Sequence, residues 1–215
     1  DLRMSRGLGD VYKRQDYELA VNGKRVTSAN ATNILDDGKA SYEDATRTLT
    51  LSGDISVTDN AVNPSGKQLI VTGKSTVTGA QRDRYAGFYS GGEPIKVAAD
   101  ADITLDTFGF GINAMGADIS GNMKICNAEY GVNGTGTTVE SGGKLIIQNA
   151  ENAVSGGGAN VYGTLEIDGA AAAVNDGGVT VHEGGVVTVT GATSGLNGGC
   201  LLYTSPSPRD MRRSR

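Results

Sequence analysis

Three carboxylates lie close together near the middle of the chain, at Asp100, Asp102 and Asp106. Around them Ile103 and Leu105 alternate with polar residues, which is typical of a β-strand with one buried face. On such a strand Asp100 and Asp102 project from the same side, because they are two positions apart. Ca²⁺ prefers roughly six to eight oxygen ligands, so we expect Ca²⁺ as the cofactor, held by Asp100 and Asp102 with carbonyl groups and water. Without a metal, the same carboxylates would form a solvated outer face.

Charged and aromatic residues gather just upstream, where Arg82, Arg84 and Tyr85 are followed by Tyr89. This segment interrupts an otherwise regular pattern, and long loops often carry function. Aromatic rings beside charged groups can stack on the faces of sugars. The residue types therefore predict a ligand-binding site made by Arg82, Arg84, Tyr85 and Tyr89. The alternative is a local excursion that packs its own aromatic rings.

The sequence shows no catalytic centre. His182 is the only histidine, and a histidine without a neighbouring nucleophile makes no triad. The glycine runs lack the Lys-Ser/Thr pair of a phosphate-binding loop. We therefore expect a protein that is not an enzyme.

The composition excludes several classes of protein. The chain has 215 residues and a formal net charge of −5, and 33 of its residues are glycine. No apolar run approaches the roughly 20 residues that a membrane helix needs. The net charge is not the basic one that nucleic acid attracts, and the two cysteines provide no disulfide framework. We expect no nucleic-acid partner and no membrane insertion in this segment.

Both ends of the chain differ from the rest. Residues 5–15 read SRGLGDVYKRQ, and residues 200–210 read CLLYTSPSPRD. One DNA string can encode the first segment while its reverse complement encodes the second, so the ends resemble a transposase-type sequencing adapter translated from opposite strands. We expect residues 1–15 and 200–215 to be adapter-derived, as in a metagenomic fragment, with the true termini and any signal peptide or anchor outside the chain. Removing their eight basic and three acidic residues from totals of 19 and 24 leaves a net charge of −10.

One short motif recurs through the interior: a small residue, an aliphatic residue and then usually asparagine. Successive aliphatics lie 20, 22, 20 and 22 residues apart, at Ile112, Val132, Val154, Val174 and Leu196. Short alternating strands and glycine turns fill each unit, and weaker copies lie upstream. The pattern predicts an all-β fold, a right-handed parallel β-helix over residues 58–199 with about seven rungs of roughly 20–26 residues. A leucine-rich repeat shares this period but needs an L-x-x-L-x-L spacing that is absent.

Asparagine follows the aliphatic residue in four of these copies, at Asn113, Asn133, Asn175 and Asn197. Stacked side-chain amides can form hydrogen bonds from rung to rung, and asparagine tolerates the left-handed turn conformation. We expect a structural asparagine ladder here, interrupted at Ser155. The alternative is that some of these amides bind a ligand.

Residues 16–57 do not follow the repeat. Tyr17, Leu19 and Val21 alternate, and the dipeptide Asn22-Gly23 then predicts a hairpin turn. A solenoid needs a cap because its first rung otherwise exposes apolar atoms and unpaired strand edges. We therefore expect residues 16–57 to form a small N-terminal β cap.

This front segment contains the patterns Y-x-L-x-V-N-G-x-x-V-T-S-A-N, I-L-x-D-G-x-A-S-Y and T-x-T-L-T-L. Followed by β-helix rungs, they resemble secreted surface proteins of gut and cellulolytic Firmicutes, the carbohydrate-binding domain proteins of the pectate-lyase-like β-helix superfamily. The resemblance covers Asp16 to Gly199 and implies an extracellular bacterial protein. Some members of that family bind acidic polysaccharide such as polygalacturonate with calcium and do not cleave it.

The residues and the resemblance together predict a secreted or cell-surface module that binds polysaccharide, or a host or cell-wall glycan, without catalysis. The ligand expected on this basis is an acidic polysaccharide, bound with the help of Ca²⁺. Two alternatives stay open. One is an adhesin or structural stalk with no site in this segment, and the other is a polysaccharide lyase or hydrolase.

Overall fold

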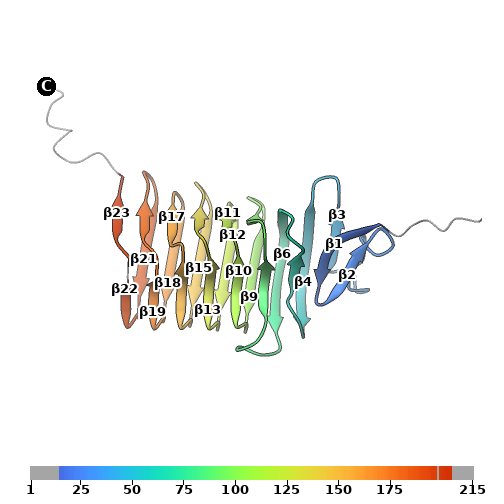
Figure 1. Ribbon diagram of the computed structural model, residues 1–215, viewed down its shortest axis with the longest axis horizontal. Helices are drawn as coiled ribbons and strands as arrows, with labels where there is room; N and C mark the ends of the chain where they lie inside the picture. The colour runs from blue at the N-terminus through green and yellow to red at the C-terminus, as the bar shows by residue number, and fades with distance from the viewer. Residues whose placement is uncertain (1–14, 198, 205–215) are drawn as a thin grey trace, which may run out of the picture.

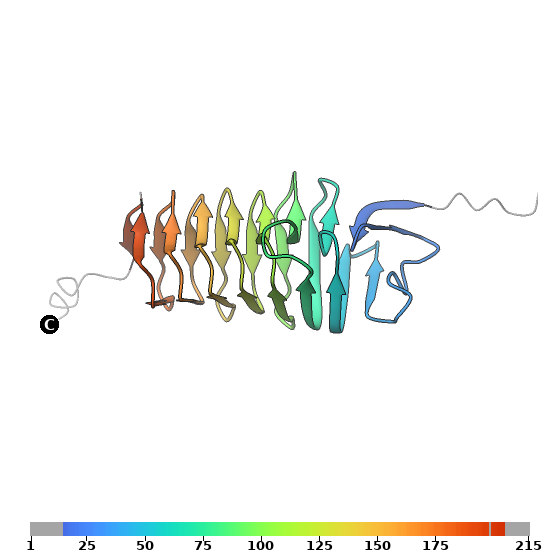
Figure 2. The ribbon, with the colours of Figure 1, turned by 90° about the horizontal axis from the view of Figure 1, so that it is seen from below.

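The computed structural model describes residues 15–197 and 199–204. The described residues form β-strands, turns and loops and contain no helix. The strands wind into a right-handed parallel β-helix of about seven turns, with a small antiparallel cap at the blue end (Figures 1 and 2). This confirms the fold predicted from the spacing of the repeat. The described part of the chain has no helix that could cross a membrane. Residues 1–14, 198 and 205–215 lie outside it, and with them most of the two segments expected to be adapter-derived.

Equivalent strands stack into three faces. The nine-stranded face contains β5 (Val62–Pro64), β7 (Ala86–Ser90), β10 (Phe110–Ala114), β13 (Tyr130–Gly134), β16 (Asn152–Gly156), β19 (Ala172–Asn175) and β22 (Ser194–Asn197), with two cap strands. The middle face contains β9 (Asp102–Asp106), β12 (Asn122–Cys126), β15 (Lys144–Gln148), β18 (Thr164–Asp168) and β21 (Val186–Thr190). The third face contains β8 (Ile95–Val97), β11 (Ala117–Ile119), β14 (Thr137–Val139), β17 (Ala159–Val161), β20 (Val179–Val181) and β23 (Leu201–Tyr203).

Two long strands join the middle and third faces. β4 (Thr48–Val57) and β6 (Leu69–Gly79) run through the corner that later rungs make with a turn. β6 pairs with β8 through its first residues and with β9 through its later ones. The two faces therefore form a single 14-stranded sheet.

The aliphatic columns form the core. Ile112, Val132, Val154 and Val174 are register partners on successive rungs, and each is buried. On β10 the residue before the column, Gly111, is buried as well. A Cβ added at Gly111 would clash with Cγ2 of Ile125 on β12 and would lie 2.6 Å from the carbonyl oxygen of Gly131 on the next rung, so only glycine fits here without a shift of its neighbours.

From β9 onward, the corner between the middle and nine-stranded faces has a left-handed residue on each described rung. Thr107, Asn127 and Asn149 have φ angles of 62°, 53° and 54°, and glycine takes over this position on the last two rungs. Nδ2 of Asn127 donates to Oδ1 of Asp106 over 2.7 Å, and Nδ2 of Asn149 donates to Oδ1 of Asn127 over 3.3 Å. This second polar ladder was not predicted from the sequence.

The cap reverses the direction of the chain at the first rung. β1 (Asp16–Val21) pairs antiparallel with β2 (Lys24–Thr27) and with β5, while β3 (Ala40–Glu43) pairs antiparallel with β4. The predicted Asn22-Gly23 turn is confirmed, since both residues have positive φ angles between β1 and β2. β4 itself pairs in parallel with β6 over its whole length, so the first rung begins inside the segment expected as cap.

The other end of the described solenoid is formed by β21, β22 and β23. β23, which belongs to the segment expected to be adapter-derived, pairs in parallel with β20. The side chains of Leu201, Leu202 and Tyr203 are all exposed.

Candidate functional site

The loop that was predicted to bind a ligand lies along a corner of the solenoid. It connects β6 to β7, and its Arg82 reaches over the next rungs. Nη2 of Arg82 donates to the carbonyl oxygens of Ala128 at 3.1 Å and of Asn149 at 3.2 Å. A Cβ at Gly109 would lie 3.0 Å from the backbone of this loop, so the loop packs closely on the corner. The Arg82 guanidinium therefore ties the loop to two successive corner turns.

Arg84 and Tyr85 lie at the end of the same loop. Cζ of Arg84 lies 5.5 Å from the centroid of the Tyr85 ring, a cation–π distance. The carbonyl oxygen of Tyr85 accepts from the backbone N–H groups of Gly109 and Phe110 at 2.9 and 3.2 Å. Arg84 is exposed, and its guanidinium makes no ion pair among the described residues.

Tyr89 lies apart from the loop, on the outside of the nine-stranded face. The three residues that precede it on β7 are buried, whereas the Tyr89 side chain is 38% exposed. Its register partner on the next rung is Asn113, whose own partner is Asn133. The four predicted ligand-binding residues are therefore divided between a corner and a face.

Beside Tyr89 the structure brings together outward side chains that the sequence analysis did not connect. They form a strip over four successive strands, β7, β10, β13 and β16. We call this set the aromatic–amide strip; it comprises Tyr89, Phe110, Asn113, Tyr130, Asn133 and Asn152. The rings of Phe110 and Tyr130 are stacked, with centroids 5.0 Å apart and planes inclined by 12°. Their spacing of 20 residues, at one position of the repeat, was a signal that could have found them.

The strip contains part of the predicted asparagine ladder. Nδ2 of Asn133 donates to Oδ1 of Asn113 at 3.3 Å, and Nδ2 of Asn197 donates to Oδ1 of Asn175 at 3.0 Å. These bonds confirm the ladder on both sides of the Ser155 interruption. Among the described side chains, Nδ2 of Asn113 and Oδ1 of Asn133 have no other partner. One amide donor and one amide acceptor thus remain free on the two strands that carry the aromatic pair.

The two candidate calcium ligands both lie next to β6. Oδ1 of Asp100 accepts a hydrogen bond from the hydroxyl of Thr72 at 2.7 Å, and Asp102 is the register partner of Lys74. Both carboxylates are exposed. Within residues 15–197 and 199–204, no three acidic, histidine or cysteine side chains are grouped so that they could hold a metal ion. Calcium at Asp100 and Asp102 stays a prediction that would need backbone and water oxygens.

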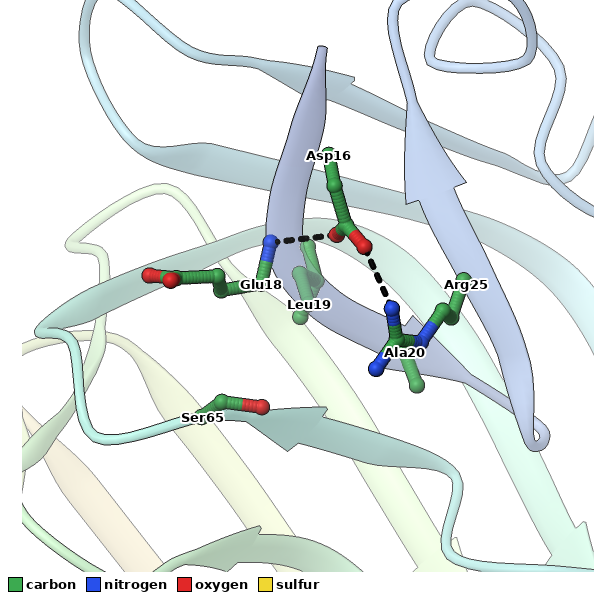
Figure 3. A pocket seen from close by; sticks show the side chains of 6 residues that line it. All are labelled: Asp16, Glu18, Leu19, Ala20, Arg25 and Ser65. Carbon is green, nitrogen blue, oxygen red and sulfur yellow. Dashed lines mark hydrogen bonds and ion pairs between the residues drawn. The ribbon is translucent and has the colours of Figure 1, made fainter. Parts of the chain in front are cut away.

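The cap has a shallow hollow between β1, β2 and the chain after β5 (Figure 3). Oδ2 of Asp16 pairs with Nη1 of Arg25 at 2.6 Å, and Oδ1 of Asp16 accepts from the backbone N–H of Glu18 at 2.9 Å. Glu18, which has a φ of 55°, pairs with Nζ of Lys67 at 2.5 Å. The charges at this hollow are therefore satisfied by one another.

A second hollow lies on the outside of the β3–β4 hairpin. Its lining is rich in hydroxyl groups and consists of Thr32, Ser41, Tyr42, Glu43, Thr48 and Thr50. Burial, and then the nearby Asp44 carboxylate, raise the pKa of the Tyr42 hydroxyl above its usual value. The carboxylate of Glu43 accepts from the hydroxyl of Thr46 at 2.9 Å.

The groups with the greatest chemical reactivity lie far apart. The His182 ring stacks on Tyr162 at 3.9 Å between centroids, and its Nε2 is 3.3 Å from Oδ1 of Asn160. Cys126 lies on the middle face, where burial raises the pKa of its thiol above the usual value and so disfavours the thiolate.

Comparisons with protein-family models, with curated proteins and with solved structures each found no match to this chain.

Proposed function

We propose that this protein is a non-catalytic polysaccharide-binding module of a secreted or cell-surface protein. The observation that carries the proposal is the aromatic–amide strip. Tyr89 lies next to the Asn113–Asn133 pair, and the stacked rings of Phe110 and Tyr130 lie on the same two strands as these asparagines. Aromatic rings next to polar groups suit the mixed apolar and hydroxylated surface of a sugar. The family resemblance of the front segment supports the same ligand class.

The shape of the surface favours a polymer over a small molecule. Small-molecule sites are concave and enclose most of their ligand. The strip is instead an open face that continues over four rungs, and the hollows described above lie in the cap. An extended chain can gather many weak contacts along such a face, which a single small sugar cannot do.

A structural stalk is the second candidate, and the later rungs favour it. There the polar side chains bond to each other, as in the Asn175–Asn197 pair and in the 2.8 Å bond from Thr190 to Asp168. Such self-satisfied ladders hold rungs together and leave fewer groups for a ligand. The aromatic–amide strip distinguishes the two candidate functions, because a stalk needs no aromatic pair on its surface.

The test is binding of the full chain to a panel of polysaccharides, with added calcium and with chelator, followed by heat and by the absorbance of unsaturated products. We expect binding without product. Tyr89→Ala should weaken binding by about tenfold, the loss of roughly one stacking contact. Tyr162→Ala is the matched control, because Tyr162 is 39% exposed but lies outside the nine-stranded face.

Three results would count against the proposal. Equal loss in Tyr89→Ala and Tyr162→Ala would show that the strip is not the site. No binding by a folded sample would favour the stalk, and product formation would reveal a catalytic base. Calcium-dependent binding that Asp100→Asn and Asp102→Asn abolish would establish the calcium prediction.

A further inference from the structure

We infer that the aromatic–amide strip binds a neutral polysaccharide, whose chain runs along the solenoid axis. This inference rests on the proposed function and departs from the acidic ligand expected from the sequence. Its first support is the strip itself: all six outward side chains are uncharged. A polyanion would find no positive partner among them.

The surroundings of the strip add negative charge. Glu129 and Glu151 come directly before Tyr130 and Asn152, at the same corner on successive rungs. The sequence holds no Lys or Arg between Lys144 and Arg209, although five acidic residues lie there. Like charges repel over a Debye length of about 8 Å at physiological salt. An acidic polysaccharide that lay along this face would be repelled by the acidic residues of the later rungs, toward the C-terminus of the protein.

The basic residues near the start of the strip offset this only in part. The Arg82 guanidinium is occupied by the carbonyl oxygens of Ala128 and Asn149. Arg84 lies against the ring of Tyr85, and Asp83 separates the two arginines in the sequence. Of the two arginines, only Arg84 keeps a guanidinium that is exposed and without an ion pair among the described residues.

The free amide groups suit the hydroxyl groups of a sugar. Nδ2 of Asn113 can donate, and Oδ1 of Asn133 can accept. A sugar hydroxyl both donates and accepts, so two neighbouring hydroxyls can satisfy both amides. Neutral and acidic sugars both carry hydroxyl groups, so the amide pair fits a sugar diol of either class, and the charge around the strip decides between them.

The direction of the polymer follows from the repeat of the face. Rungs are spaced by about 4.8 Å, so the strip extends about 14 Å from β7 to β16. The length of one pyranose sugar along a glycan chain is close to the spacing between successive rungs. A glycan chain parallel to the axis can therefore place successive sugars over successive rungs, and affinity should rise with length up to about four sugars.

The experiment compares neutral polysaccharides, a β-glucan and a galactomannan, with polygalacturonate on the full chain. Affinity electrophoresis covers the polymers, and calorimetry covers neutral oligosaccharides of increasing length. We expect binding to at least one neutral polymer that is unaffected by chelator and changes less than about twofold between roughly 0.05 and 0.5 M NaCl. Polygalacturonate should bind at least about tenfold more weakly, with or without calcium.

The matched variants are Asn133→Asp and Asn175→Asp, which make the same change at equivalent ladder positions of one face. Asn133→Asp should weaken the neutral ligand by about tenfold, because a carboxylate cannot donate to Oδ1 of Asn113 and so breaks the amide pair that the ligand contacts. Asn175 lies outside the aromatic–amide strip, so Asn175→Asp should leave the affinity unchanged. Far-ultraviolet circular dichroism confirms that both variants fold.

The outcomes separate the inference from the function on which it rests. Binding to polygalacturonate alone, or to both polymer classes equally, overturns the neutral ligand but leaves polysaccharide binding in place. Binding to none of the polymers by folded protein overturns both. Equal affinities for Asn133→Asp and Asn175→Asp overturn the position of the site.

Discussion

The two ends of the solenoid contain the same kinds of aliphatic residue but bury them to different degrees. At the capped end Ile34 and Leu49 are fully buried in the hydrophobic core. On the last complete rung Val189 and Leu196 are 40% and 39% exposed, although their equivalents one rung earlier are buried. The difference shows that a rung does not make its own core. Each rung buries its column only when a neighbour covers it.

The cap covers the first rung by changing the direction of the strands. β1 lies antiparallel on β5, and β3 lies antiparallel on β4, so the parallel stacking stops there. The outermost strands at this end are β2 and β3. At the other end of the described residues, β21, β22 and β23 are the outermost strands of their sheets.

The largest effect should come from removing one leucine from a covered rung. Leu145→Ala on β15 deletes a side chain with 0% exposure, so it should lower the free energy of unfolding by about 2–5 kcal/mol. Leu196→Ala on β22 deletes the same atoms from a side chain that is already 39% exposed, and it should cost less than about 1.5 kcal/mol. Urea denaturation followed by circular dichroism measures both. Equal losses would mean that the last rung is covered as well as the middle one.

The spacing of the repeat was enough to predict the fold. Alternating aliphatics every 20 or 22 residues can bury one face only by stacking, which leaves few architectures. The prediction was weakest where the pattern is interrupted. The sequence pattern did not show that β4 and β6 each continue through a corner as one long strand. One strand of ten residues and two shorter strands joined by a turn show the same alternation of aliphatic and polar residues.

The candidate site was harder to predict, because its contacts join distant residues. Tyr89 was singled out from its neighbours in the sequence, yet its partners Asn113 and Asn133 come from later rungs. The two carbonyl groups that hold Arg82 are 46 and 67 residues away. Only the register of the stacked rungs reveals such contacts. Overlaying the repeats by that register would have placed Phe110 over Tyr130 from the sequence alone.

Adding one methyl group at equivalent glycines should have a smaller effect. A Cβ at Gly131 would lie 2.5 Å from the carbonyl oxygen of Ala153 on the next rung, so Gly131→Ala should cost about 1–3 kcal/mol. Gly195 occupies the same motif position on the last rung, and no described atom lies within 4 Å of its added Cβ. Gly195→Ala should therefore be neutral, or stabilise by up to about 1 kcal/mol by restricting the unfolded chain. The same denaturation assay applies, and a destabilised Gly195→Ala would show that another segment covers this rung.

The smallest effect should be a pH dependence that belongs to the capped end. Burial and the Asp44 carboxylate raise the pKa of Tyr42 above 10.0 in the folded cap, so the fold disfavours the tyrosinate. The stability linked to this group is present in full below about pH 10 and is lost as the pH rises through the raised pKa. Unfolding midpoints between about pH 8 and 11 should fall less in Tyr42→Phe than in the parent chain, with Asp44→Asn in between. Identical pH profiles for the three proteins would show that the cap does not distinguish the two forms of Tyr42. A profile that changes only with Asp44→Asn would show that Tyr42 is not the titrating group.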